Sequence, residues 1–158
     1  MLNNHYITKK EHQRWIEKLE KSEDAKVWVI HVNNFPIGTV YLENIDYENR
    51  NTNWDFYIGE TYYRGKGIGS ISLYRLMEYV FDKMKFHKMY TSVLDNNHGA
   101  LNLYKKFGFR EEGKLKKHIL REGEYIDMFL VGILEKEWEE VKDSLPIVDF
   151  INMSDELE

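Results

Sequence analysis

Cysteine is absent from this sequence of 158 residues, which excludes disulfide bonds, thiolate-bound zinc, iron–sulfur clusters and a cysteine nucleophile. Proline occurs only twice and aromatic residues make up 15%, so the composition is not that of a linker or a disordered chain. Apolar residues make up 42%, and a chain of this length can bury a substantial core. We therefore expect a single domain over residues 1–145, followed by a tail over residues 146–158.

An excess of positive charge is lacking as well. The chain has 22 Lys and Arg against 27 Asp and Glu, a formal net charge of −5, which argues against general affinity for nucleic acids or anionic membranes. It has neither an apolar run of roughly 18 residues nor a signal-peptide pattern. Its six histidines show no metal-ligand spacing. The sequence therefore predicts a cytoplasmic protein without a metal, a nucleic-acid partner or a membrane segment.

The first half of the chain has the pattern of a helix followed by an antiparallel meander. Thr8 and Glu11 form a capping-box pattern, and the apolar face of the helix would contain Trp15, Ile16 and Leu19. Three short β-rich runs follow, separated by polar turns at 33–36 and 48–51: residues 27–30, 37–42 and 54–58.

The second half begins with a change of period. Apolar residues recur every three or four positions from Ile68 to Met84, which predicts a helix of about four turns. The later elements expected are a strand at 89–94, a helix from about His98, two strands around a turn at 121–124, of which the second includes a buried run at 128–134, and a helix at 135–142. Strands and helices of this kind indicate a fold of the α+β (α/β) class.

The most informative segment is a glycine-rich loop between a strand and the long helix, with the sequence Arg64-Gly65-Lys66-Gly67-Ile68-Gly69. Free amides at a helix start bind anions, and glycines let the backbone approach phosphate oxygens. A Walker loop is excluded because Gly65-Lys66 is followed by Gly67, and a dinucleotide fingerprint is excluded by its different glycine spacing. The loop indicates a phosphate-bearing ligand, with a tight turn that binds nothing as the alternative.

Two motifs in this order resemble the GNAT family of N-acetyltransferases. Arg64-x-x-Gly67-x-Gly69 is similar to the acetyl-CoA pyrophosphate loop of that family, and the segment from Asn97 to Phe109 is similar to its N-x-x-A-x-x-L-Y-x-x-x-G-F pattern. The order of meander, loop, helix, strand, helix and hairpin is also that of the family. The resemblance implies the GNAT fold, acetyl-CoA as co-substrate and a small-molecule amine as acceptor.

Smaller similarities point to one branch within that family. Glu11-His12-x-x-Trp15-Ile16, the strand Ile37-Gly38-x-Val40-Tyr41 and the hairpin Gly123-x-Tyr125-x-Asp127 look most like enzymes that acetylate a UDP-linked amino-dideoxy sugar on the way to pseudaminic acid, a flagellin decoration. Polyamine and ribosomal-protein N-acetyltransferases share the hairpin pattern and stay open as alternatives. A non-catalytic acyl-CoA-binding module is a further alternative.

The resemblance also implies a set of donor contacts. The pyrophosphate would lie on the amides of Gly65 to Gly69, and the pantetheine arm would lie along the end of the strand that carries Tyr57. The residues expected to bind the donor are Tyr57, Ile58, Gly59, Arg64, Gly65, Lys66, Gly67, Ile68, Gly69, Asn97, Asn102, Tyr104 and Lys105.

Acetyl transfer needs an acid for the leaving thiolate and a base for the amine. A covalent acetyl-cysteine is impossible here, so direct attack by the amine is expected. Tyr104 matches the family's tyrosine that protonates the thiolate. The base stays open: a carboxylate on the central strands (Glu43, Asp55 or Glu60), or a water relayed through Ser92, which occupies the position of a glutamate in the sugar-acetylating branch.

The start of the chain departs from the family pattern. The first strand and helix of the family have no counterpart before Thr8. The next strand, near Val27, would then lie at an open sheet edge. We therefore expect a homodimer that covers this edge, with the apolar tail from Ile147 to Met153 as the segment that adds across it.

Overall fold

The structure is a computed structural model, and it describes residues 10, 13–14, 17–18 and 21–145. The predicted capping box, the apolar face of the first helix and the C-terminal tail lie outside these residues. In chain order the described elements are β1 (Lys26–Val32), β2 (Phe35–Asp46), β3 (Asn51–Ile58), α2 (Ile68–Glu78), β4 (Lys88–Leu94), α3 (His98–Lys106), β5 (Arg110–Arg121), β6 (Glu124–Leu134) and α4 (Glu135–Val141).

The predicted antiparallel meander is confirmed, with longer strands than expected: β1 spans Lys26–Val32 and β2 continues to Asp46. β1 pairs with β2 and β2 with β3, both antiparallel. The first turn contains only Asn33 and Asn34, with φ of +50° and +64°, because two residues of this type close a hairpin. Phe35 and Pro36 therefore belong to β2 and not to the turn. β3 begins at Asn51, three residues before the predicted start, because the buried Thr52 continues the pairing toward β4.

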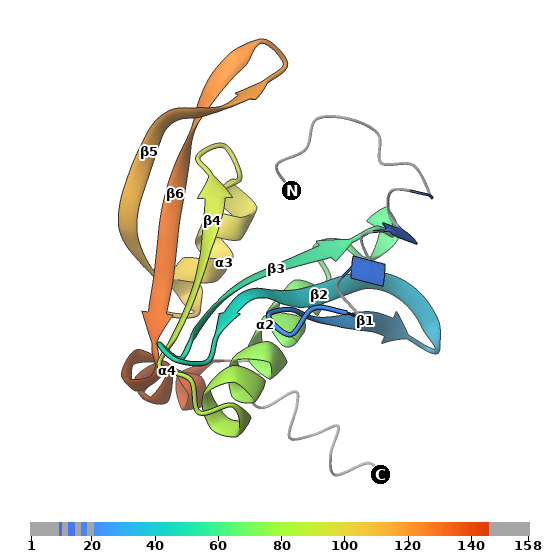
Figure 1. The fold of residues 1–158 in the computed structure, drawn as a ribbon. Helices are drawn as coiled ribbons and strands as arrows, with labels where there is room; N and C mark the ends of the chain where they lie inside the picture. Colours follow the sequence, from blue (N-terminus) through green and yellow to red (C-terminus); the bar gives the residue numbers. More distant parts are fainter. Residues whose placement is uncertain (1–9, 11–12, 15–16, 19–20, 146–158) are drawn as a thin grey trace.

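The six strands form one mixed sheet in the order β1-β2-β3-β4-β6-β5, which confirms the predicted α+β class. Among the described strand pairs, β3 with β4 is the parallel one. Figure 1 shows that these two central strands meet at one end and separate toward the other, so that the meander and the β5–β6 hairpin form two arms of the sheet.

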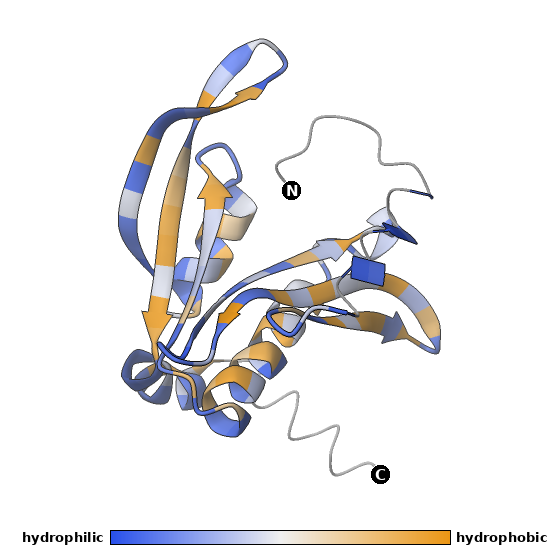
Figure 2. Cartoon of the chain, in the orientation of Figure 1, coloured by the Kyte–Doolittle hydropathy of each residue, from blue (hydrophilic) through white to orange (hydrophobic). Residues whose placement is uncertain are grey.

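A single core lies between the sheet and the helices. Alternate strand residues such as Leu42, Trp54 and Ile133 pack against the apolar face of α2, which includes Leu73 and Met77. The hydropathy colouring of Figure 2 shows this apolar stripe on α2 and the apolar strand β6. None of the described helices is both long and apolar enough to cross a membrane.

The long helix predicted up to Met84 is present but changes geometry near its end. After Glu78 the chain continues as a π-helical turn over Tyr79–Lys83, in which the Met84 N–H donates to the Tyr79 carbonyl. The turn keeps Val80 and Phe81 buried. The wider turn was not predicted, because the apolar spacing of a π-turn is close to that of an α-helix.

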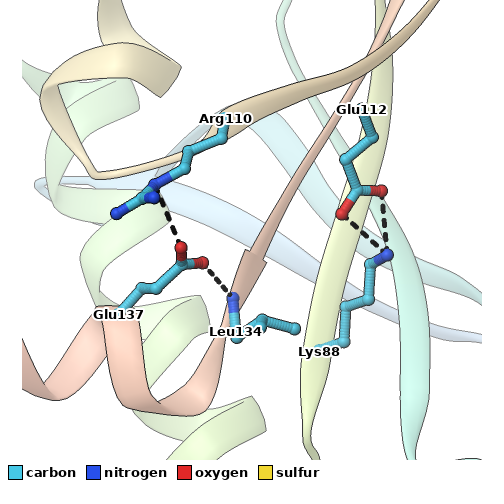
Figure 3. A network of polar contacts seen from close by, with 5 residues as sticks. All are labelled: Lys88, Arg110, Glu112, Leu134 and Glu137. Atoms are coloured by element: carbon cyan, nitrogen blue, oxygen red, sulfur yellow. Dashed lines mark hydrogen bonds and ion pairs between the residues drawn. The ribbon is translucent and has the colours of Figure 1, made fainter.

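Ion pairs fix the end of the sheet where the strands converge (Figure 3). Glu137 of α4 accepts a hydrogen bond from the Leu134 N–H at 2.9 Å. It also forms an ion pair with Arg110 of β5 at 3.0 Å. Lys88 of β4 contacts Glu112 of β5 at 2.8 Å. These contacts join β4, β5, β6 and α4 at this end, whereas the other end is open between β3 and β4.

Candidate active site

The opening between β3 and β4 is the place where the predicted site residues gather. The strands pair only at Asn51–Lys88, Thr52–Met89 and Asn53–Tyr90. Beyond these pairs they separate (Figure 1). Within the described part of the chain, segments 54–58 and 91–94 have no strand partner on the sides that face each other. Such backbone groups can pair with an extended ligand between the strands.

The glycine-rich loop lies at the open end of β3, just before α2. Gly65 and Gly67 have φ of +74° and +83°, which residues with a side chain rarely adopt. A Cβ at either position would have no described atom within 4 Å, so the space in front of this backbone is open. Gly67 is also the N-cap of α2, and no side chain among the described residues caps that helix. The exposed amides, with the helix dipole behind them, fit a phosphate-bearing donor.

The two cations of the loop contact the protein itself. Arg64 donates from Nε and Nη2 to the Ile58 carbonyl oxygen, at 3.1 and 2.9 Å. Lys66 Nζ lies 3.2 Å from the ring centroid of Tyr62, a cation–π contact. Arg64 thus fastens the loop to the end of β3. A direct role of Arg64 or Lys66 in phosphate binding stays a prediction.

The segment predicted to contact the donor's arm is partly engaged within the sheet. The Gly59 N–H donates to the Ile37 carbonyl oxygen at 2.9 Å, and the Ile58 carbonyl oxygen already accepts from Arg64. The side chain of Tyr57 is 44% exposed at the same end of β3. Contacts of Ile58 and Gly59 with a donor would therefore use their remaining backbone groups, or would displace Arg64.

Ile68 and Gly69 form the first turn of α2, and Gly69 has a packing role. A Cβ on Gly69 would lie 3.0 Å from the ring of Phe56 on β3, which is closer than ordinary contacts allow. The missing side chain lets α2 begin directly against β3. The loop amides are thereby held at the edge of the opening.

Tyr104 of α3 is the best-defined predicted catalytic residue. It is only 4% exposed, and its ring packs edge-on against Trp54, at 5.2 Å between centroids, and at a tilt against Phe109, at 5.6 Å. Burial raises the pKa of Tyr104, and the negative charge of Asp55 raises it further. The phenol is therefore protonated at neutral pH, as an acid that donates to a leaving thiolate requires.

Asp55 lies on the sheet face opposite to the one that packs on α2. Burial alternates along β2 and β3, so Tyr41, Glu43 and Asp55 share this second face. Tyr41 is directly opposite Asp55, and its Oη donates to Asp55 Oδ2 at 3.2 Å. The other carboxylate oxygen, Oδ1, accepts from the Phe56 N–H at 2.8 Å. Both oxygens of Asp55 are thus oriented by the chain.

Burial and nearby carboxylates, including Asp55, raise the pKa values of Tyr41 and Glu43. The pKa of Tyr41 is raised by burial, then by Asp55 and Glu43, and Tyr104 also contributes. The pKa of Glu43 is raised by burial and by the carboxylates of Asp55 and Asp24, and it is lowered by Lys18. The group Tyr41, Glu43, Asp55 and Tyr104 is therefore electrostatically coupled, and we call it the acidic cluster.

The remaining predicted residues lie outside this cluster, and Asn102 and Lys105 line the same groove as Tyr104. Ser92 is on β4 opposite Leu130, and its hydroxyl has no hydrogen bond to another described residue. Glu60 is exposed at the start of the glycine loop. Asn97 caps α3, because its side chain accepts from the Ala100 N–H at 3.2 Å. Asn102 and Lys105 line a groove of about 610 Å³ between α3, β5 and α4.

Tyr41 is the residue of the cluster that the sequence analysis missed. A tyrosine in a strand is common, and its alternation with buried Val40 and Leu42 indicates only that it faces away from the core. Its role depends on the register that places it opposite Asp55. Among the described residues, no group of three or more His, Asp or Glu is placed to hold a metal ion.

Comparisons with known proteins agree with this geometry. The family model described as acetyltransferase (GNAT) domain matches residues 3–130. An uncharacterized prophage-derived N-acetyltransferase, YokL of Bacillus subtilis, is 26% identical over 128 residues, which are 80% of this chain and 71% of YokL.

Two further comparisons, one of sequence and one of structure, match spermidine N-acetyltransferase of Vibrio cholerae. The spermidine N(1)-acetyltransferase of Vibrio cholerae is 32% identical over 102 residues, which are 65% of this chain and 58% of that enzyme. The chain thus spans less than two thirds of this relative in sequence. The crystal structure of the Vibrio cholerae spermidine N-acetyltransferase in complex with CoA and spermine has a TM-score of 0.79 and 27% identity, covering 87% of this chain and 81% of that one.

Proposed function

Since the chain belongs to the GNAT acetyltransferase family, whose members use acetyl-CoA as the acetyl donor, we propose that it acetylates a primary amine of a polyamine. The observation that carries the choice of acceptor is the acidic cluster beside the opening of the sheet. Glu43 and Asp55 face the same side of adjacent strands, and the carboxylate of Asp24 also acts on Glu43. Such a site attracts a cationic amine.

The donor side of the proposal is supported by the loop and the opening. The amides of Gly65 to Gly69 fit the pyrophosphate, and the unpaired segments of β3 and β4 fit an extended arm that continues the sheet. The thioester would then lie near Tyr104, whose ring contacts Trp54 at the point where the strands separate. Acetyl-CoA supplies the activated acetyl group, and the chain positions it.

We assign the base to Asp55 and the acid to Tyr104. Asp55 takes a proton from the ammonium, and the free amine attacks the thioester carbonyl carbon. The new C–N bond forms as the C–S bond breaks, and the thiolate takes the proton of Tyr104. Asp55 is preferred over Glu43 because Asp55 is the carboxylate whose charge acts on Tyr104.

The charge of the proposed base acts on the proposed acid, which couples the two proton transfers. The negative charge of Asp55 raises the pKa of Tyr104, in addition to the larger effect of burial. When Asp55 accepts the proton of the amine, this charge disappears and the pKa of Tyr104 falls. Tyr104 becomes a stronger acid at the stage when the thiolate leaves.

A nucleotide-linked amino sugar, the acceptor suggested by the branch resemblance, has weaker support. The hairpin residue Asp127 accepts from the Lys117 N–H at 2.7 Å and pairs with Lys114 at 2.9 Å. Lys114 also lies 3.7 Å from Asp95. Asp127 therefore has a structural role, and Lys114 on the same hairpin is already neutralised by two carboxylates.

The test is a thiol-release assay with acetyl-CoA and a panel of amines. The panel contains spermidine, 1,4-diaminobutane, a UDP-linked 4-amino-4,6-dideoxy sugar and a short peptide with a free N-terminus. We expect the highest kcat/KM with a polyamine and an acetylated product identified by mass spectrometry. A preference for the amino sugar or the peptide would replace the polyamine. Binding of acetyl-CoA without turnover of any amine would favour a non-catalytic module.

We also propose that two copies associate along β1. Among the described strands β1 pairs only with β2, and Val29 on it is 52% exposed. Light scattering on the full chain should give a dimer, and Val29→Lys should shift it toward the monomer, because a lysine blocks edge pairing. A chain ending at Leu145 would show whether the tail takes part. A full chain that is monomeric at all concentrations would contradict the proposal.

A further inference from the structure

Glu43 has an environment that the proposed chemistry does not explain. Its carboxylate is half-buried on the same face as Asp55, two residues beyond Tyr41 along β2. The charged groups that act on it are Asp55 from β3, Asp24 ahead of β1 and Lys18. Two other carboxylates and the ammonium of Lys18 thus act on the Glu43 carboxylate. A half-buried carboxylate next to another carboxylate is costly unless a cation accompanies it.

The register fixes the separation between Glu43 and Asp55. Asp55 is directly opposite Tyr41, so Glu43 is its diagonal neighbour on the same face. The backbone positions of diagonal neighbours in an antiparallel pair are roughly 7–8 Å apart, and their Cβ atoms are somewhat closer. A propane or butane spacer between two nitrogens covers this separation, with each nitrogen at one carboxylate. A monoamine would reach only one of the two.

The contacts of the two carboxylates also differ. Asp55 is held by Tyr41 Oη and the Phe56 N–H, and its charge acts on Tyr104. The charges that act on Glu43 are those of Asp55, Asp24 and Lys18, whereas burial and then the charge of Asp55 raise the pKa of Tyr104. Asp55 therefore belongs to the reacting end of the acceptor, whereas Glu43 is one spacer length farther away.

We propose that Glu43 binds the second, non-reacting ammonium of the acceptor, so that this residue makes the enzyme selective for diamines and polyamines over monoamines. The inference rests on the proposed polyamine acetylation and names the residue that selects the substrate. Glu43 is thus a specificity-determining residue, while the proton transfers take place at Asp55 and Tyr104.

The test compares 1,4-diaminobutane with n-butylamine, which lacks only the second nitrogen. In Glu43→Gln the ratio of kcat/KM for the diamine over the monoamine should fall about ten- to a hundredfold, the loss expected for one charge-assisted hydrogen bond. The change should lie in KM for the diamine and not in kcat. Glu43→Asp should give an intermediate ratio. Glu48→Gln, the same chemical change in the exposed turn after β2, should leave the ratio unchanged.

A second measurement needs no variant. In the unaltered chain, kcat/KM for diamines should be highest with propane or butane spacers and fall with ethane or hexane spacers. A flat dependence on spacer length, or an unchanged selectivity ratio in Glu43→Gln, would overturn the role of Glu43. If the unaltered chain acetylates no diamine, the proposed function fails and the inference fails with it, a result that is visible before any variant is made.

Discussion

The two sides of β4 differ sharply. On one side β4 pairs with β6 at seven successive positions, from Lys88–Leu134 to Leu94–Met128. On the other side it pairs with β3 at only three positions and then separates. The closed side is continuous sheet, and the open side contains Asp55, Tyr104 and the glycine loop. One edge of β4 thus belongs to continuous sheet, and its other edge borders the candidate site.

The two edges of β4 also differ in how their backbone hydrogen bonds are satisfied. Unpaired backbone groups of a strand must find other partners, in water or in a ligand. The closed side is reinforced by the Lys88–Glu112 pair and by Arg110–Glu137 near the convergent end (Figure 3). The continuous pairing on the closed side leaves the open side free to pair with the proposed donor in place of a neighbouring strand.

The largest expected effect is on the open side, at Asp55. Asp55→Asn keeps the shape of the side chain and its acceptor oxygen for Tyr41 but removes the base. We expect kcat with a polyamine to fall about 10²- to 10⁴-fold, with acetyl-CoA affinity nearly unchanged. Steady-state kinetics and calorimetric titration with acetyl-CoA measure the two quantities.

The matched control for this variant is Asp82→Asn, in an exposed position of the π-helical turn. It should leave kcat unchanged. A loss of only a fewfold in Asp55→Asn would place the base elsewhere and would bring the Ser92 water relay back as the leading alternative.

A somewhat smaller effect is expected at Tyr104. Tyr104→Phe preserves the packing against Trp54 and Phe109 and removes the phenol. Turnover should fall about 10²-fold, the lower range for loss of a general acid. The raised pKa of Tyr104 keeps the phenol protonated well into the alkaline range, so it should cause no loss of wild-type activity between neutral pH and about pH 9. Normal turnover of the variant would mean that water protonates the thiolate.

A substitution in the glycine loop should lower the affinity for acetyl-CoA. Gly67→Val places a branched side chain in the open space before the amides, at a φ of +83°. Acetyl-CoA affinity should fall at least about tenfold, as expected for loss of charge-assisted hydrogen bonds to phosphate. Gly123→Val is the matched control, because Gly123 has the same φ and equally open space but lies in the hairpin turn. Equal affinities of the two variants would remove the loop assignment.

The sequence predicted the parts of the fold that depend on local pattern. The spacing from Ile68 to Met84 and the alternation in the meander led to the correct elements. The polar start of β3 at Asn51 was missed, since Asn and Thr are weak strand signals and the pairing with Lys88 is a long-range contact. The π-helical turn was missed because it shares the apolar spacing of the helix before it.

The candidate site was less predictable than the fold. Motif residues such as Gly67 and Tyr104 stand out by their sequence context. The opening between β3 and β4 does not, because no residue pattern encodes where two parallel strands cease to pair. The link between Tyr41 and Asp55 depends on the register set by the turn and the irregular pairing between Glu43 and Asp46. Their sequence separation of 14 residues carries no signal of this contact.

The smallest expected effect is on the hairpin, at Asp127. The backbone N–H of Lys117 and then the ammonium of Lys114 hold the pKa of Asp127 below its ordinary value of 3.8. A folded-state pKa below the unfolded one stabilises the fold above the unfolded value, and this contribution is lost as the pH falls through the folded value. Asp127→Asn should therefore lower Tm by at most about a few degrees at pH 7. The difference from wild type should shrink below about pH 4.

The turnover of Asp127→Asn shows whether Asp127 only stabilises the hairpin or also contributes to acceptor binding. If it only fastens the hairpin, Asp127→Asn should retain turnover within about twofold, unlike Asp55→Asn. Thermal melts at pH 7 and pH 3 and kinetics with spermidine give both results. A large loss of turnover with an unchanged Tm would show that the hairpin contacts the acceptor. That outcome would mean that the hairpin on the closed side of β4 also contributes to substrate binding.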